Sequence, residues 1–393
     1  MKNLNILVTG GAGYVGSVLI PSLIEDNHYV KCLDRFFFGE EFLSSNRFKG
    51  NLELIRNDIR WFDPKILQDV DVVIDLAALS NDPVGELNPE KTYEINHKGR
   101  ARVGKLSKEA GVSQYILASS ASIFGQQEGI ADENSEVFPL TSYSKANHNA
   151  EIDNIALNDE NFTVTALRFS SLFGVSPRMR FDIAINEMVL ELYKTKKITV
   201  RGKTNQRPFL HLKDAVNAYK LVLQAPKEKI SGQIFNVGTD EQNYKIGDLA
   251  QEVANAIDVN CMLELGDNKD HRSYFTSFKK IQKTLSFKPK FDVKYGSKEI
   301  YNGLKNGEID DSIRTITLKW YKHIMSNSQL LKKFSIDGNV LLFYLTHSEN
   351  THNNSHDLSF CETTVGFKGH LISNFGSSQR IPPVYFGMYF CVI

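Results

Sequence analysis

The sequence predicts an α/β fold in which a doubly wound parallel sheet is followed by a smaller, mainly helical domain. Two observations support this fold class. Short, almost continuously apolar runs alternate with segments of helical periodicity, which is typical of parallel strands buried on both faces. A glycine-rich stretch joins the first apolar run to the first helical segment, as expected where a buried strand turns tightly into a helix.

The predicted elements follow one another regularly in the first half of the chain. Apolar runs that predict strands occupy 4–9, 30–34, 52–56, 72–76, 115–119 and 164–168, with helical segments such as 18–24 and 98–110 between them. From about residue 175 the pattern changes to separate helices at 183–193, 212–224, 246–256 and 294–305, with short strands such as 234–237. We therefore expect a sheet domain over 1–174, to which some later segments return, and a second domain over 175–342.

Composition excludes several functional classes. The 393 residues include 46 basic and 46 acidic side chains, so the formal net charge is zero, and binding of nucleic acid or an anionic membrane by bulk electrostatics is not expected. No run of 18 apolar residues is present, so no membrane span is expected. The four cysteines (Cys32, Cys261, Cys361 and Cys391) form no C-x-x-C pair, which favours a cytoplasmic location.

Residues 343–393 differ in composition from the rest of the chain. Only five of these 51 residues are charged: Glu349, Asp357, Glu362, Lys368 and Arg380. The segment is therefore expected to be a low-charge, poorly structured extension. His347, His352 and His356 lie in it without cysteine or regular carboxylate partners, so no metal site is expected there.

The glycine-rich stretch predicts a dinucleotide site. It reads Thr-Gly-Gly-Ala-Gly-Tyr-Val-Gly over residues 9–16, directly after the first strand and at the start of the first helix. Gly10, Gly13 and Gly16 allow a tight turn, close approach of a pyrophosphate and close packing of the helix on the sheet, which is the Rossmann pattern. Asp34 ends the second strand and is suited to accept hydrogen bonds from ribose hydroxyls. This acid favours NAD over NADP, although the adjacent Arg35 weakens that preference.

Further motifs occur in a consistent order. They are Asn57-Asp58-Ile59, Leu76-Ala77-Ala78-Leu79-Ser80, Asn96 within a helix, the serine-rich segment 119–125, Pro139 with Tyr143, Arg207 with Asp214, Asn236 before Gly238, and Arg272. Together with the glycine-rich turn, they resemble the extended short-chain dehydrogenase/reductase superfamily, in its NAD-dependent nucleotide-sugar epimerase/dehydratase branch. The resemblance covers roughly residues 4–340, so it makes the first domain an NAD-binding Rossmann domain and the second a sugar-nucleotide domain.

The resemblance implies a role for each matching position. Tyr143 is implied to be the catalytic acid or base, and Ser120 to hold the same sugar hydroxyl, because proton and hydride must leave one C–O–H group together. The implied cofactor-binding residues are Gly10, Gly13, Tyr14, Val15, Gly16, Asp34, Arg35, Asp58, Ile59, Leu76, Ala77, Ala78, Asn96 and Ser119. The implied substrate-binding residues are Ser80, Ser171, Arg178, Arg180, Arg207, Asn236 and Arg272.

The sequence departs from the family at its catalytic lysine. The family pattern is Tyr-x-x-x-Lys, whereas Asn147 stands four residues after Tyr143. Glu151 keeps the family register, and Lys145 points about 200° away around the helix, so it is no substitute. Lowering a phenol pKa from about 10 to about 7 requires roughly 4 kcal/mol of differential stabilisation, and asparagine has no charge with which to provide it. We therefore expect an enzyme of this family whose activity is weak or lost.

Two smaller departures are present. Phe124 stands where tyrosine is commoner, and Ser171 stands where the family has asparagine near the substrate phosphates. The cluster of Arg178, Arg180, Arg207 and Arg272 is expected to hold a diphosphate in spite of this change.

Three functions remain open at this stage. The leading one is oxidation and reduction at C4 of a UDP-, dTDP- or GDP-sugar, as in an epimerase. A 4,6-dehydratase is disfavoured, because Ala121 and Ser122 occupy the positions of its acid/base pair. The alternatives are a keto-sugar reductase that exchanges NAD(P)H and a non-catalytic NAD and nucleotide-sugar binding protein. The resemblance also implies a homodimer.

Overall fold

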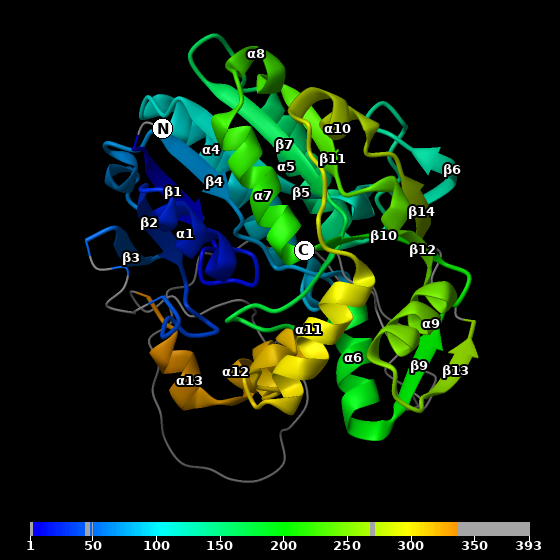
Figure 1. Ribbon diagram of the computed structural model, residues 1–393. Helices are drawn as coiled ribbons and strands as arrows, with labels where there is room; N and C mark the ends of the chain where they lie inside the picture. The colour runs from blue at the N-terminus through cyan, green and yellow to red at the C-terminus, as the bar shows by residue number, and fades with distance from the viewer. Residues whose placement is uncertain (1–2, 44–47, 49, 268–271, 337–393) are drawn as a thin grey trace, which may run out of the picture.

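The computed structural model describes residues 3–43, 48, 50–267 and 272–336. Its centre is a seven-stranded, wholly parallel sheet in the order β11-β7-β5-β4-β1-β2-β3 (Figure 1). The strands are β1 (Asn5–Thr9), β2 (Tyr29–Asp34), β3 (Leu52–Arg56), β4 (Val72–Asp75), β5 (Gln114–Ser120), β7 (Thr163–Phe169) and β11 (Gln233–Val237). The predicted fold class is confirmed, and each predicted strand lies within one or two residues of its expected bounds.

Helices cover both faces of the sheet. On one face, α1 (Gly16–Glu25) and α7 (Leu212–Gln224) pack on alternate side chains of β1 and β2, such as Ile6 and Val30. On the other face, α4 (Arg100–Glu109) and α5 (Ser142–Ile155) lie over Val73 and Leu117. Because both faces are covered, nearly every residue of β1, β4 and β5 is buried, which explains the continuous apolar runs.

The strand order reverses direction at β1, which pairs with β2 on one side and β4 on the other. The connections from β1 and β4 therefore leave toward opposite faces of the sheet. This opens a crevice at the carboxyl ends of the strands, which is where ligands bind in open α/β sheets.

The second region combines helices with small sheets. The helices α6 (Ala184–Thr195), α9 (Ile246–Ile257) and α11 (Val293–Lys305) pack together around an apolar cluster that includes Met188 and Leu249. The short strands are β6 (Gln126–Ala131), β8 (Ser171–Phe173), β9 (Lys197–Arg201), β10 (Gln206–His211), β12 (Asn243–Lys245), β13 (Met262–Gly266) and β14 (Ser273–Thr276).

Later parts of the chain return to the first sheet. β11 pairs with β7, and α12 (Thr317–Ser326) and α13 (Ser328–Lys333) pack beside β2 and β3, where Trp320 Nε1 donates to the Phe37 carbonyl at 2.7 Å (Figure 1). The remaining helical turns are η2 (Pro64–Leu67), α2 (Asp82–Gly85), α3 (Pro89–Tyr93), η3 (Glu94–Gly99), η4 (Ala121–Phe124), α8 (Lys227–Ile230), η5 (Asp240–Gln242), α10 (Lys279–Leu285) and η6 (Ile313–Thr315). The predicted extension 343–393, with its three histidines, lies outside the described residues.

Candidate active site

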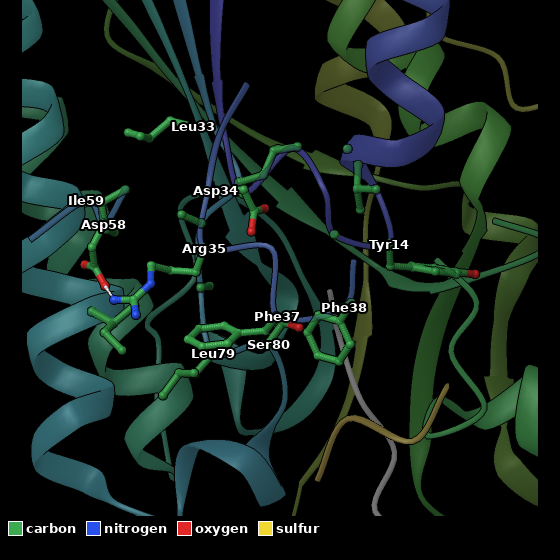
Figure 2. Close-up of a pocket in the computed structure, with 18 of the residues that line it drawn as sticks. Tyr14, Leu33, Asp34, Arg35, Phe37, Phe38, Asp58, Ile59, Leu79 and Ser80 are labelled. Carbon is green, nitrogen blue, oxygen red and sulfur yellow. Dashed lines mark hydrogen bonds and ion pairs between the residues drawn. The ribbon is translucent and has the colours of Figure 1, made fainter. Parts of the chain in front are cut away.

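A large cavity lies in the crevice at the carboxyl ends of the strands. It encloses roughly 1010 Å³ of empty space, including its open mouth, and its wall is drawn in Figure 2. The sequence-predicted residues that line it are Gly10, Gly13, Tyr14, Val15, Gly16, Asp34, Arg35, Asp58, Ile59, Leu76, Ala77, Ala78, Ser80, Arg178 and Arg180. The structure thus brings together side chains from the ends of four strands and from the second region.

Gly10 and Gly16 of the glycine-rich turn lie where a side chain would collide with neighbouring backbone. Gly10 has a φ of +66°, and a Cβ there would lie 2.8 Å from the Ala77 Cα. A Cβ on Gly16 would collide with the backbone of Gly11. The turn leads directly into α1, whose N-terminal end carries the partial positive charge of the helix dipole. This arrangement fits a pyrophosphate.

Asp34 is held at the cavity edge by the backbone. Its Oδ2 accepts from Ala12 N at 2.9 Å and its Oδ1 accepts from Phe36 N at 2.7 Å. Burial raises the pKa of Asp34 in spite of these hydrogen bonds. Each oxygen keeps a second lone pair, so the carboxylate can still accept the two hydroxyls of a ribose.

Arg35 and Asp58 form a buried ion pair beyond Asp34. Arg35 Nη1 lies 2.9 Å from Asp58 Oδ2, and Figure 2 shows the guanidinium turned toward Asp58 rather than into the space beside Asp34. Arg60 also contacts Asp58, through Nε and Nη2 at 2.9 Å each. Burial alone would raise the pKa of Asp58, but the hydrogen bonds and charges of Arg60 and Arg35 hold that pKa below its usual value. Arg60 was not identified from the sequence.

Arg178 and Arg180 bring positive charge to the opposite wall. Arg180 is fixed by the Asp182 carboxylate and by the Ser80 hydroxyl and carbonyl. Arg178 donates through Nη2 to Thr317 Oγ1 at 3.0 Å and stacks on the Phe38 ring, but its Nε and Nη1 are buried without a partner. Burial, together with the Arg180 charge, lowers the pKa of Arg178 to about 10. Arg178 lines the cavity, and a guanidinium with two unpartnered nitrogens suits an anionic group of a bound dinucleotide.

Asn96 supports the cavity from behind. It is fully buried in the π-helical turn η3, where its Oδ1 accepts from Leu79 N at 2.8 Å and its Nδ2 donates to the Leu79 carbonyl at 3.1 Å. These two bonds fix the loop after β4. Asn96 thus supports the cavity lining through the backbone of Leu79, and its implied role in cofactor binding stays a prediction.

The predicted catalytic residues lie outside the lining of this cavity. Tyr143 is the second residue of α5 and is 2% exposed, and Thr141 caps the helix through the Ser144 N–H at 3.1 Å. Asn147 follows one turn later on the same helical face and is also buried. Ser120 ends β5, where its hydroxyl accepts from Ser122 N at 3.1 Å.

The most important residue that the sequence did not single out is Arg100. It begins α4, is 1% exposed, and donates from Nη1 to Asn147 Oδ1 at 2.9 Å. Its Nε contacts Asp75 Oδ2 at 3.2 Å. A cation is thus present beside the position of the family lysine, but it comes from another helix. Sequence spacing gave no sign of this, because 47 residues separate the two side chains.

Ser119, another of the implied cofactor-binding residues, lies near the end of β5. Ser119 donates to Glu151, which in turn holds Arg168 through two guanidinium nitrogens, so this part of the site is a buried support.

The other predicted substrate residues lie toward the second region. Arg272 pairs with Asp82, Arg207 donates to the Arg272 carbonyl at 2.5 Å, Asn236 Nδ2 donates to the Ser277 carbonyl at 3.2 Å, and Ser171 Oγ is buried without a partner.

Three aromatic residues that were not predicted complete the cavity wall. Phe37 and Phe38 follow β2, and Tyr321 comes from α12. Their rings meet edge to face or at a tilt, with centroids 5.5 to 5.9 Å apart. Within the part of the chain that the structure describes, no helix is long and apolar enough to span a membrane, and no group of three or more metal-ligating side chains is present.

Comparison with known proteins identifies relatives over about three quarters of the chain. A Methanocaldococcus jannaschii protein named as a UDP-glucose 4-epimerase is 27% identical over 312 residues, which cover 77% of this chain and 98% of that protein. UDP-glucuronic acid decarboxylase 1 of Arabidopsis thaliana is 27% identical over 318 residues, or 78% and 71% of the two chains.

A solved structure and a family match complete the comparison. The structure of MoeE5 in complex with UDP-glucuronic acid and NAD has a TM-score of 0.68 and 24% identity, covers 77% of this chain and 99% of that one, and supports the fold. Residues 6–238 match the NAD-dependent epimerase/dehydratase family. That stretch includes the glycine-rich turn, Asp34 and Tyr143 of the site. The chain belongs to the NAD-dependent epimerase/dehydratase family.

Proposed function

We propose that this chain binds NAD in the cavity and oxidises, then reduces, C4 of a UDP-sugar, with a turnover that is slow for its family. The observation that carries the proposal is the cavity itself, which is lined by the glycine-rich turn, by Asp34 and by Arg178, whose guanidinium has two nitrogens without a partner. Gly10, Gly13 and Arg178 would hold the pyrophosphate, and Asp34 the adenosine ribose. When bound, NAD supplies a hydride acceptor.

The chain's own residues would handle the proton and the orientation of the sugar. Tyr143 would remove the C4 hydroxyl proton as the C4 hydride leaves, and Ser120 would hold the same oxygen at the end of β5. Reversal of these transfers on the opposite face of the keto sugar yields the epimer. Both residues are buried and on rigid elements, which limits the freedom that must be lost on reaching the reactive geometry.

The UDP-sugar is proposed from charge and from the named relatives. Arg272 and Arg207 lie next to each other near the start of α5, and paired guanidinium groups suit a diphosphate. The relatives are named for UDP-glucose and UDP-glucuronic acid. A diphosphate would compete with Asp82 for Arg272, because these two side chains are paired in the structure.

Slow turnover follows from Asn147. The neutral amide gives Tyr143 no charge of its own to stabilise a phenolate. A phenol with a pKa near 10 is ionised in about one molecule in a thousand at neutral pH, and losing tuned acid–base catalysis costs about 10²- to 10⁴-fold in rate. The non-catalytic binding protein is the second candidate, and the same Asn147 is the observation that favours it.

The proposal is tested on the purified full-length chain. Bound nucleotides are first identified by mass spectrometry, and UDP-glucose and UDP-glucuronic acid are then followed by NMR for the C4 epimer. We expect retained NAD and slow epimer formation that Tyr143→Phe abolishes. Retained NAD without any turnover supports the binding protein instead, NAD(P)H consumption without recycling supports the reductase, and absence of NAD binding contradicts all three. The homodimer and the cytoplasmic location stay predictions.

A further inference from the structure

We propose that Arg100 is a positioning residue that orients the Asn147 amide, so that the pair presents one neutral hydrogen-bond donor where the family has a lysine ammonium. The proposal rests on the proposed function, because the acceptor for this donor is the nicotinamide-side ribose of bound NAD. It assigns a role to a residue that neither the family pattern nor the sequence spacing identified.

The Arg100 guanidinium donates four hydrogen bonds. Its Nε donates to Asp75 Oδ2 at 3.2 Å, and its Nη2 donates to the Asp75 carbonyl at 3.1 Å and to the Ala118 carbonyl at 2.5 Å. Its Nη1 donates to Asn147 Oδ1 at 2.9 Å. The guanidinium thus joins the ends of β4 and β5 to the middle of α5, and its plane cannot turn without breaking several bonds at once.

The chemistry of arginine decides which way the Asn147 amide faces. A guanidinium group has only donors, so the atom next to it must be the amide oxygen. The amide nitrogen therefore faces away from Arg100. Asn147 Nδ2 is buried without a hydrogen-bond partner, in a side chain that is only 2% exposed. A buried donor of this kind needs an explanation, and a ligand acceptor on the Tyr143 side of α5 provides one.

A lysine could not occupy position 147 in this arrangement. Its ammonium has no acceptor for Arg100 and would place a second cation beside the first in a buried site. Arg100 and Asn147 therefore belong together. Arg100 does not restore the missing charge either, because the Asp75 carboxylate neutralises it and also accepts from Thr9 Oγ1 and the Tyr115 hydroxyl at 2.5 Å each. The Arg100–Asn147 pair therefore keeps a hydrogen-bond donor at this position, but it lacks the positive electrostatic potential of a lysine ammonium.

Two variants at the pair test this, and a third serves as a control. Arg100→Lys keeps the charge opposite Asp75 but cannot make all four contacts, and Asn147→Asp keeps the oxygen that faces Arg100 while removing the Nδ2 donor. Tyr115→Phe removes the hydrogen bonds of the Tyr115 hydroxyl to Asp75 and to the Arg100 carbonyl, and it leaves the four guanidinium contacts of Arg100 in place. NAD affinity by isothermal titration and thermal unfolding of the NAD-free chain are measured for all three.

We expect NAD affinity to fall about tenfold in Arg100→Lys and at least tenfold in Asn147→Asp, as for the loss of one buried hydrogen bond. Asn147→Asp should unfold no earlier than the wild type, because its carboxylate pairs with Arg100. Tyr115→Phe should lower the unfolding temperature and leave NAD affinity unchanged.

Two results would overturn the inference. One is unchanged NAD affinity in Asn147→Asp, and the other is an equal loss of NAD affinity in Arg100→Lys and Tyr115→Phe. In both cases the wild type still binds NAD and the proposed function stands. A wild-type chain that binds no NAD overturns the proposed function, and this inference with it.

Discussion

Arg35 Nη1 lies 2.9 Å from Asp58 Oδ2, and Arg35 Nη2 donates to the Phe334 carbonyl at 2.5 Å. The basic residue that follows Asp34 in the sequence is therefore engaged elsewhere, with a carboxylate from the next strand end and a carbonyl from the end of α13. A 2′-phosphate beside Asp34 would meet a carboxylate, and Arg35, the basic residue next to it in the sequence, is held by other partners. This relationship favours NAD over NADP.

The first prediction concerns this preference. Asp34→Ser should weaken NAD about tenfold, because the ribose loses a charged acceptor, and should give little NADP binding since Arg35 stays paired. The double variant Asp34→Ser with Asp58→Asn releases Arg35 and should raise NADP affinity about tenfold over the single variant. Both dinucleotides are titrated calorimetrically. Asp63→Ser, in an exposed turn, serves as the control, and NADP binding by the single variant alone would contradict the argument.

The second prediction separates binding from stability at Arg178. Removal of this buried, incompletely paired cation by Arg178→Met should leave the NAD-free chain as stable as before or more so, because desolvation of the charge is no longer required. NAD affinity should fall more than tenfold, since a partner of the pyrophosphate is lost. Thermal unfolding and calorimetry measure the two effects.

Arg314→Met is the matched control for Arg178. Arg314 is more exposed and pairs with Glu41 at 2.8 Å. Arg314→Met should therefore change NAD affinity by no more than about twofold and the free energy of unfolding by no more than about 0.5 kcal/mol. If Arg178→Met lowered the unfolding temperature and the NAD affinity together, Arg178 would be a residue that stabilises the folded chain rather than one that binds NAD.

The third prediction concerns acid stability. Burial alone would raise the pKa of Glu299, but its hydrogen bonds and charge contacts with His211 and Lys213 lower the pKa to about 2. The folded state therefore binds this proton less readily than the unfolded state does. The stabilisation is fully present above pH 4.5, the ordinary value, and is lost as the pH falls toward 2.

Glu299→Gln should remove most of that acid-dependent loss, so that the free energy of unfolding changes less with pH between these values. Urea unfolding at several pH values measures it. Glu308→Gln, at an exposed carboxylate, should leave the pH dependence as it is in the wild type. If the free energy of unfolding of Glu299→Gln changed with pH as steeply as that of the wild type, groups other than Glu299 would be responsible for the loss of stability in acid.

The fourth prediction tests the buried support beside the catalytic strand. Glu151 accepts from Ser119 Oγ at 2.8 Å and from Arg168 Nε at 3.1 Å, and all three residues are buried. Glu151→Gln leaves the Arg168 charge uncompensated and should lower the free energy of unfolding by about 3–5 kcal/mol. Double replacement by Glu151→Gln and Arg168→Met should recover most of this loss in urea unfolding. Equal instability of the single and double variants would contradict the ion-pair explanation.

Much of this molecule follows from its sequence. Buried parallel strands must be apolar on both faces, so the six runs of the first domain predicted six strands within one or two residues. The glycine-rich turn, Asp34 and the motifs after β3 and β4 predicted the cavity lining, because strand ends at a switch point converge whatever the rest of the fold does. The sequence also identified Asn147 as the departure at the catalytic helix, since the distance from Tyr143 to Glu151 fixes the helical register.

The partners of these side chains were decided only by the tertiary structure. Arg100 reaches Asn147 from α4 and is itself paired with Asp75 of β4, Arg35 is occupied by Asp58, and Tyr321 completes the cavity from α12. Sequence spacing determines contacts within one helix or strand, but contacts between elements depend on how the elements pack. The sequence alone determined that a lysine was absent from the catalytic helix. Packing decided that the buried Arg100 guanidinium, paired with Asp75, lies beside Asn147, because a charge in a low-dielectric core needs a counter-ion and here that counter-ion comes from another element.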